Sequence, residues 1–90
     1  MLSVNTYDDG YQVLNTNSSF IQNIHFCFTM DEDGETVIDS EWGELIVKID
    51  GRQYCYQDFA LITFFSFINS ESLGKFYNSN IRNLYECEIY

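Results

Sequence analysis

The chain contains no proline, a single histidine and only four basic residues among its 90 residues. Without proline it has no proline-rich linker or proline-rich recognition segment. With so few Lys and Arg side chains it lacks the cations that neutralise phosphates, which argues against direct contact with nucleic acid or with an anionic membrane surface. We therefore expect no direct nucleic-acid or membrane partner.

The cysteine pattern and the apolar runs bear on the location of the protein. The three cysteines, Cys27, Cys55 and Cys87, are odd in number and widely spaced, which is not the pattern of a disulfide framework. The longest apolar stretch, residues 59–68, has about half the length of a membrane-spanning helix. Residues 1–5 lack the basic and apolar regions of a signal peptide. These features favour a cytoplasmic location, which is the host cell cytoplasm if a phage encodes the protein.

Apolar and aromatic side chains, by contrast, are abundant, at 46% and 18% of the residues. This content is too high for an intrinsically disordered chain, which combines low hydrophobicity with high net charge. The length is sufficient for one hydrophobic core and too short for two. We expect one compact acidic domain spanning residues 1–90.

The clearest local signal is the pair Asp50-Gly51, which is typical of a two-residue type I′ turn and predicts a hairpin over 45–49 and 52–56. In that register three facing pairs share one side of the hairpin: Ile49 with Arg52, Val47 with Tyr54, and Leu45 with Tyr56. All but Arg52 are apolar in large part, so a slip by one residue would mix apolar and polar side chains. The register is therefore well specified.

Alternating apolar residues predict further strands. The strongest runs from Phe20 to Met30, and a short hairpin is expected around Asp8-Asp9. A weaker strand is expected over Thr36–Trp42, with a bulge at Gly43 that separates it from the next strand.

After the hairpin, the spacing of the apolar residues changes from that of a strand to that of a helix. Asp58 is a good N-cap for a helix over about 59–69, which is apolar on most sides and should be covered by strands on one side and a second helix on the other. Ser72 caps that second helix, over about 73–81, and a last strand follows over 85–90. The order predicts an α+β fold: an antiparallel sheet of about four to five strands packed against two short helices, with a final C-terminal strand.

No residue pattern indicates catalysis or metal binding. His25 has no serine or acid in a nucleophile motif, and the chain has neither a phosphate-binding loop nor a metallohydrolase motif. His25 and the three cysteines add up to four soft ligands, but they lack the tight pairs typical of structural zinc sites. We expect a protein that is not an enzyme, with no catalytic, cofactor-binding or metal-binding residues and no cofactor.

The most unusual feature is acidic. Fourteen acids and four bases give a net charge of −10, and the segment from Asp31 to Glu44 holds seven acids and no base. Solubility needs a net charge of only about 2–8 in a small domain, so a basic protein partner is the simplest reason for the excess. The alternative is a solvated edge. The candidate contact residues are these acids and the single tryptophan: Asp31, Glu32, Asp33, Glu35, Asp39, Glu41, Trp42 and Glu44.

The predicted strand would also space these acids in a particular way. Residues i and i+2 of a strand are about 6.6–6.8 Å apart, so Asp39 and Glu41 would present carboxylates at nearly the spacing of phosphates. Reversing Asp33, Asp39 and Glu41 to Lys should weaken binding without harming the fold. Reversing Asp8 and Asp9, remote in sequence, is the expected control.

A small, acidic, aromatic-rich chain without a catalytic constellation is similar to the phage-encoded inhibitors of bacterial defence, such as anti-CRISPR and anti-restriction proteins that mimic nucleic acid. The similarity is one of composition over the whole chain and rests on no motif. It implies a non-enzymatic inhibitor, encoded by a phage or mobile element. Such an inhibitor binds the basic nucleic-acid-binding groove of a defence nuclease or CRISPR effector.

Two other functions fit the same composition. One is an immunity protein that neutralises a basic toxin nuclease, which uses the same physics on a different partner. The other is a small structural or regulatory interaction module whose acids only increase solubility. Genomic neighbours would separate the first from the defence inhibitor, and the salt dependence of binding would separate either from the second.

Overall fold

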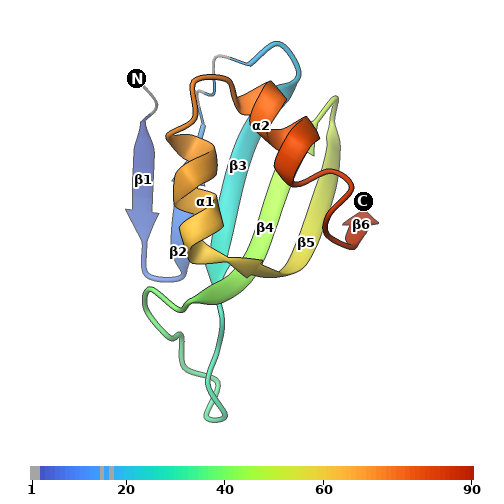
Figure 1. Ribbon diagram of the computed structural model, residues 1–90. Coiled ribbons are helices and arrows are strands. Elements are labelled where there is room, and N and C mark those ends of the chain that lie inside the picture. Colours follow the sequence, from blue (N-terminus) through green and yellow to red (C-terminus); the bar gives the residue numbers. More distant parts are fainter. Residues whose placement is uncertain (1–2, 15, 17) are drawn as a thin grey trace.

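The computed structural model describes residues 3–14, 16 and 18–90, so Met1 and Leu2 of the segment compared with a signal peptide lie outside it. Six strands form one antiparallel sheet in chain order (Figure 1). The elements are β1 (Val4–Tyr7), β2 (Gly10–Val13), β3 (Ile21–Phe28), β4 (Trp42–Ile49), β5 (Arg52–Ala60), α1 (Leu61–Ile68), α2 (Leu73–Asn80) and β6 (Cys87–Ile89). The α+β fold is confirmed, with six strands where about four to five were predicted.

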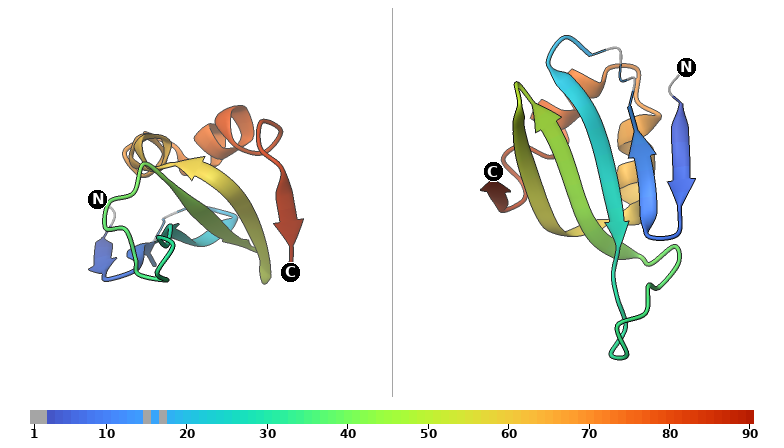
Figure 2. Two further views of the ribbon diagram at one scale, coloured as in Figure 1. Left: turned by 90° about the horizontal axis from the view of Figure 1, so that it is seen from below. Right: turned by 180° about the vertical axis from the view of Figure 1, so that it is seen from behind.

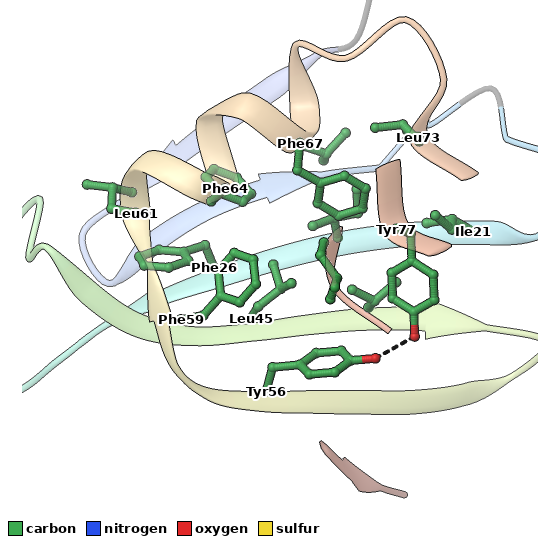
Figure 3. Close-up of a cluster of buried hydrophobic side chains, with 14 of the residues drawn as sticks. Ile21, Phe26, Leu45, Tyr56, Phe59, Leu61, Phe64, Phe67, Leu73 and Tyr77 are labelled. Atoms are coloured by element: carbon green, nitrogen blue, oxygen red, sulfur yellow. Dashed lines mark hydrogen bonds between the residues drawn. The ribbon is translucent and has the colours of Figure 1, made fainter. Parts of the chain in front are cut away.

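Both helices lie on one face of the sheet, and no described helix covers the other face, which we call the uncovered face (Figure 2). The core fills the space between the two layers (Figure 3). Phe26, Leu45 and Val47 rise into it from the strands, and Phe64 and Phe67 descend from α1, all of them fully buried. Along β3, β4 and β5, successive side chains point alternately into the core and to the uncovered face. This explains why apolar and more polar residues alternate in their sequence.

The Asp50-Gly51 hairpin is confirmed, with the predicted register. Asp50 and Gly51 have φ angles of 50° and 78°, the pair of positive values that a type I′ turn requires. Val47 faces Tyr54 and Leu45 faces Tyr56, as the alternation predicted. The short hairpin around Asp8-Asp9 is also confirmed, as β1 and β2.

The predicted role of Asp58 is wrong. It lies within β5 at a bulge, where Gln57 and Asp58 together lie opposite the single residue Glu44 of β4. Asp58 has a φ of 53°, a left-handed conformation that aspartate tolerates better than most residues. The bulge expected at Gly43 is therefore at the right place in the sheet, but the extra residue belongs to β5.

Because of this bulge, α1 also begins later than predicted. β5 continues to Ala60, which pairs with Trp42, and α1 begins at Leu61 instead of residue 59. Ala60 makes no side-chain capping bond, but the backbone N–H of Leu61 donates to the carbonyl of Glu41, 2.8 Å away. A neighbouring chain segment thus replaces the predicted side-chain cap, because it satisfies one of the free N–H groups of the first turn.

The connection between β3 and β4, residues 29–41, is a long loop that projects beyond the sheet (Figure 1). The weak strand expected over Thr36–Trp42 is wrong: Thr36 forms one isolated bridge to Met30, and β4 begins only at Trp42. Asp39 has a φ of 56°, which an extended strand does not permit. β3 correspondingly ends at Phe28 and not at Met30.

The second helix is confirmed at its start, where the Ser72 side chain accepts a hydrogen bond from the backbone N–H of Lys75. α2 ends at Asn80, one residue early, and the last strand is the three-residue β6. The expected coverage of α1 on both sides is wrong, because α2 lies beyond the end of α1 and not across its outer face (Figure 1). In the described part of the chain no helix is long and apolar enough to cross a membrane.

One buried polar contact ties α2 to the sheet. The hydroxyls of Tyr56 in β5 and Tyr77 in α2 are 2.5 Å apart and form a hydrogen bond inside the core (Figure 3). Burial raises the pKa of both phenols above the ordinary value of 10.0, so both stay neutral.

Replacing Tyr77 with Phe should lower the free energy of unfolding by about 1–3 kcal/mol, because the Tyr56 hydroxyl then stays buried without this partner. The double replacement of Tyr56 and Tyr77 by Phe should be less harmful than the sum of the two single replacements, since no hydroxyl is left behind. Urea unfolding of the three variants measures this. Additive losses would contradict a coupled pair.

Candidate functional site

All eight predicted contact residues lie at one end of the sheet, where β3 ends and β4 begins. Their positions divide into three groups: Asp31, Glu32, Asp33 and Glu35 in the tight turn of the projecting loop, Asp39 and Glu41 where the loop returns to the sheet, and Trp42 and Glu44 in β4. The fold thus places them near one another but not on one strand.

In the tight turn, one acid organises the backbone and the others are free to make contacts. Oδ1 of Asp31 accepts hydrogen bonds from the backbone N–H groups of Asp33 and Glu35, each 2.9 Å away. The backbone of Asp31 also pairs with Glu35. The side chains of Glu32, Asp33 and Glu35 are exposed. Asp31 therefore shapes the loop, whereas these three carboxylates face solvent.

Where the loop returns to the sheet, Asp39 has a structural role that the sequence did not reveal. Its Oδ1 accepts a hydrogen bond from the Tyr11 hydroxyl, 2.5 Å away, and this bond raises the pKa of Tyr11. Asp39 lies in a turn and Glu41 just before β4, so the predicted phosphate-like spacing of their carboxylates along a strand is wrong. Reversing Asp39 would also remove this hydrogen bond, so Asp39 is a poor choice for a reversal that is meant to leave the fold intact.

Trp42 and Glu44 continue the site onto β4. Trp42 is 54% exposed, which is unusual for a large aromatic side chain. Glu44 is half-buried on the uncovered face of the sheet and accepts a hydrogen bond from the Gln57 side chain.

Three further acids, which were not among the predicted contact residues, lie at this end. The turn of β1 and β2 holds Asp8 and Asp9, and the carbonyl of Asp9 accepts from the backbone N–H of Phe28, 2.8 Å away, at the end of β3. Asp58 lies at the bulge opposite Glu44. Asp8 and Asp9 are therefore neighbours of the loop and are unsuitable as a remote control. We call the following set the acidic end: Asp8, Asp9, Asp31, Glu32, Asp33, Glu35, Asp39, Glu41, Glu44 and Asp58.

The charges of the molecule are segregated. Outside the acidic end the chain has four acids, Asp50, Glu71, Glu86 and Glu88, and four bases, Lys48, Arg52, Lys75 and Arg82. These two sets balance, so the acidic end accounts for the whole net charge of −10. Such a concentration of one sign produces a potential that attracts cationic partners from a distance.

The thiols near this end are poorly suited to chemistry. Cys27 lies on the uncovered face with its Sγ 3.7 Å from Nε2 of His25. Burial, followed by the charge of Glu44, raises the pKa of Cys27 to about 11. Burial is also the first cause of the raised pKa of Cys55. Both thiols are protonated at neutral pH, and a protonated thiol is a weak nucleophile and a weak metal ligand.

Other parts of the molecule offer few reactive groups. Within the described residues, no three His, Cys, Asp or Glu side chains gather closely enough to hold a metal ion. A hollow of about 870 Å³ lies between the connection of β2 to β3 and the connection of α1 to α2, far from the acidic end. Its lining, over the part of the chain that the structure describes, has Glu71 and Lys75 as its charged side chains and is otherwise mainly serine, asparagine and apolar residues.

Comparison with known proteins identifies a domain family. A protein-family model described as the KTSC domain matches residues 39–85, just over half of the chain. The matched segment begins at Asp39 and contains β4, β5, α1 and α2, but not the tight turn of the projecting loop. No curated protein and no solved structure matches the chain.

Proposed function

The chain belongs to the KTSC domain family, whose description names no activity, and from its charge arrangement we propose a non-enzymatic acidic inhibitor. In this proposal the acidic end occupies the basic nucleic-acid-binding groove of a partner protein. The observation that carries the proposal is that the acidic end accounts for the entire net charge of −10, while the rest of the molecule is neutral.

The physical argument starts from repulsion. Ten carboxylates at one end of a small domain repel one another and destabilise the folded state. A solvated edge needs far fewer charges to stay soluble, and it does not need them on a projecting loop. The loop projects beyond the sheet (Figure 1), and it holds the exposed residues Glu32, Asp33 and Glu35. Their carboxylates can therefore enter a concave surface ahead of the rest of the molecule.

The partner we propose first is a bacterial defence nuclease, of restriction or CRISPR type, because its nucleic-acid groove is lined with Lys and Arg. In that case the gene belongs to a phage or mobile element. A basic toxin nuclease has the same kind of groove, and the same surface would bind it.

The test is a competition experiment. The immobilised protein captures its partner from bacterial lysate, and the purified partner is then bound to a fluorescent DNA or RNA duplex. We expect the protein to displace the duplex, and to do so less well as salt rises from about 0.1 M to about 0.5 M, where the Debye length falls to about 4 Å. A partner that binds the protein and the duplex at the same time would contradict the proposal, since it would show that the groove is not the site.

A further inference from the structure

Among the described residues, α1 exposes two large apolar side chains beside an exposed polar one. Of its eight residues, Leu61, Phe64 and Phe67 point into the core, but Ile62 is 76% exposed and Phe65 is 37% exposed. Positions i and i+3 of a helix lie on the same side, so Ile62 and Phe65 are neighbours on its surface. Ser66 is exposed on the same side, and its hydroxyl donates to the carbonyl of Ile62. A helix of a small soluble domain normally has polar residues at such positions, so Ile62 and Phe65 are unusual there.

The exposed side of α1 borders the base of the projecting loop. The ring centroids of Tyr11 and Phe65 are 5.5 Å apart, and the hydroxyl of the same Tyr11 bonds to Asp39. Ile38, which precedes Asp39 in the turn, is 72% exposed. Tyr11 thus links the turn to α1, and we call Ile62 and Phe65 the α1 patch.

Acids flank this patch. Asp39 is joined to it through Tyr11, and Glu41 lies at the start of α1, where its carbonyl accepts from the Leu61 N–H. Single exposed apolar residues are common and need no explanation. Neighbouring apolar side chains with a charged rim, as here, are the arrangement that an interaction site uses.

We propose that the α1 patch docks a basic amphipathic helix of the partner protein. The apolar side chains of that helix pack on Ile62 and Phe65, and its Lys and Arg side chains pair with Asp39 and Glu41. This mode is the packing of an amphipathic helix against an apolar surface. The inference rests on the proposed function and adds the chemistry of the partner: it contributes an apolar anchor beside its basic groove.

Charge complementarity favours a basic helix over a second copy of the chain as the partner of the α1 patch. A second copy of the chain would approach through a two-fold contact, which sets the same patch against itself and brings the two acidic ends together. That arrangement is unfavourable because each acidic end carries the whole net charge of −10. A basic helix instead relieves the repulsion and covers the apolar side chains at the same time.

The test uses two synthetic helical peptides of about five turns with the same Lys residues. One has Leu on the opposite face and the other has Gln there. Fluorescence polarisation should show that the protein binds the Leu/Lys peptide at least about tenfold more tightly than the Gln/Lys peptide, because only the former buries apolar surface. Ile62→Ser should remove most of this difference. Leu84→Ser, matched in chemistry and 68% exposed at the turn after α2, should leave it unchanged.

The possible results separate this inference from the proposed function. If both peptides bind equally, or if Ile62→Ser does not change the binding, the proposed docking at the α1 patch is wrong. Neither result affects the proposal that the acidic end displaces the duplex. Discrimination between the peptides without displacement of duplex supports the patch and overturns the groove. A wild-type dimer in sedimentation that Ile62→Ser converts to a monomer shows that a second copy covers the patch, which also overturns the inference.

Discussion

Phe64→Ala is expected to lower the free energy of unfolding by about 3–5 kcal/mol, the range for truncating a fully buried aromatic side chain. Phe64 has no exposed surface, and its ring centroid lies 5.3 Å from that of Phe26 and 5.8 Å from that of Tyr11. It therefore joins α1 to both β2 and β3. Removing the ring takes away its burial and leaves a cavity that the surrounding strands cannot close without breaking their pairing.

The neighbouring Phe65 supplies the control, because it has the same chemistry in the same helix but is 37% exposed. Phe65→Ala should cost only about 1 kcal/mol. Urea unfolding followed by circular dichroism measures both variants. A domain of this size has a total stability of roughly 5–13 kcal/mol, so Phe64→Ala should leave it marginally folded or unfolded at 37 °C. Equal losses in the two variants would contradict the assignment of Phe64 to the core.

The parts of the fold that could be predicted are those that a few adjacent residues determine. Asp50-Gly51 requires positive φ angles and a two-residue turn, and this turn alone sets the register of β4 and β5. Ser72 could be assigned as a cap because its side chain needs only the N–H of Lys75, three residues later.

The errors occurred where a distant segment decides between two local possibilities. Aspartate is favourable both at an N-cap and in a left-handed bulge, so the sequence around Asp58 fits either. The pairing of Ala60 with Trp42 selects the bulge, and that pairing depends on the whole sheet. The failure at Thr36–Trp42 has a similar origin, because the hydrogen bond from Tyr11 holds Asp39 in a turn.

Part of the acidic end could have been predicted from the sequence. In an antiparallel sheet whose strands follow chain order, alternate turns lie at the same end, so the turn at Asp8-Asp9 and the connection from β3 to β4 must be neighbours. Assuming that order would have added Asp8 and Asp9 to the site. The α1 patch could not be predicted from the sequence, because the exposure of Ile62 and Phe65 depends on where α2 lies.

The strongest effect on function is expected from reversing acids that have no structural role. Glu32, Asp33 and Glu41 are exposed, and the hydrogen bonds that involve the latter two use only their backbone. Replacing all three with Lys should weaken binding to the captured basic partner on the order of 100-fold, because attraction becomes repulsion at the contact and the association rate falls. The melting temperature should stay the same or rise, since repulsion within the acidic end decreases.

The matched control reverses Glu71, Glu86 and Glu88, which are exposed and lie outside the acidic end. Each reversal adds two positive charges, so both triple variants change the net charge from −10 to −4. Any difference between them therefore reports the position of the charges and not their number. Surface plasmon resonance should show less than about a threefold loss for the control. Raising salt to about 0.5 M should slow association of the wild type and of the control, but barely affect the Glu32, Asp33 and Glu41 variant. If the two triple variants bind equally well, long-range net charge alone governs association, and the acidic end is only a solvated edge of the sheet.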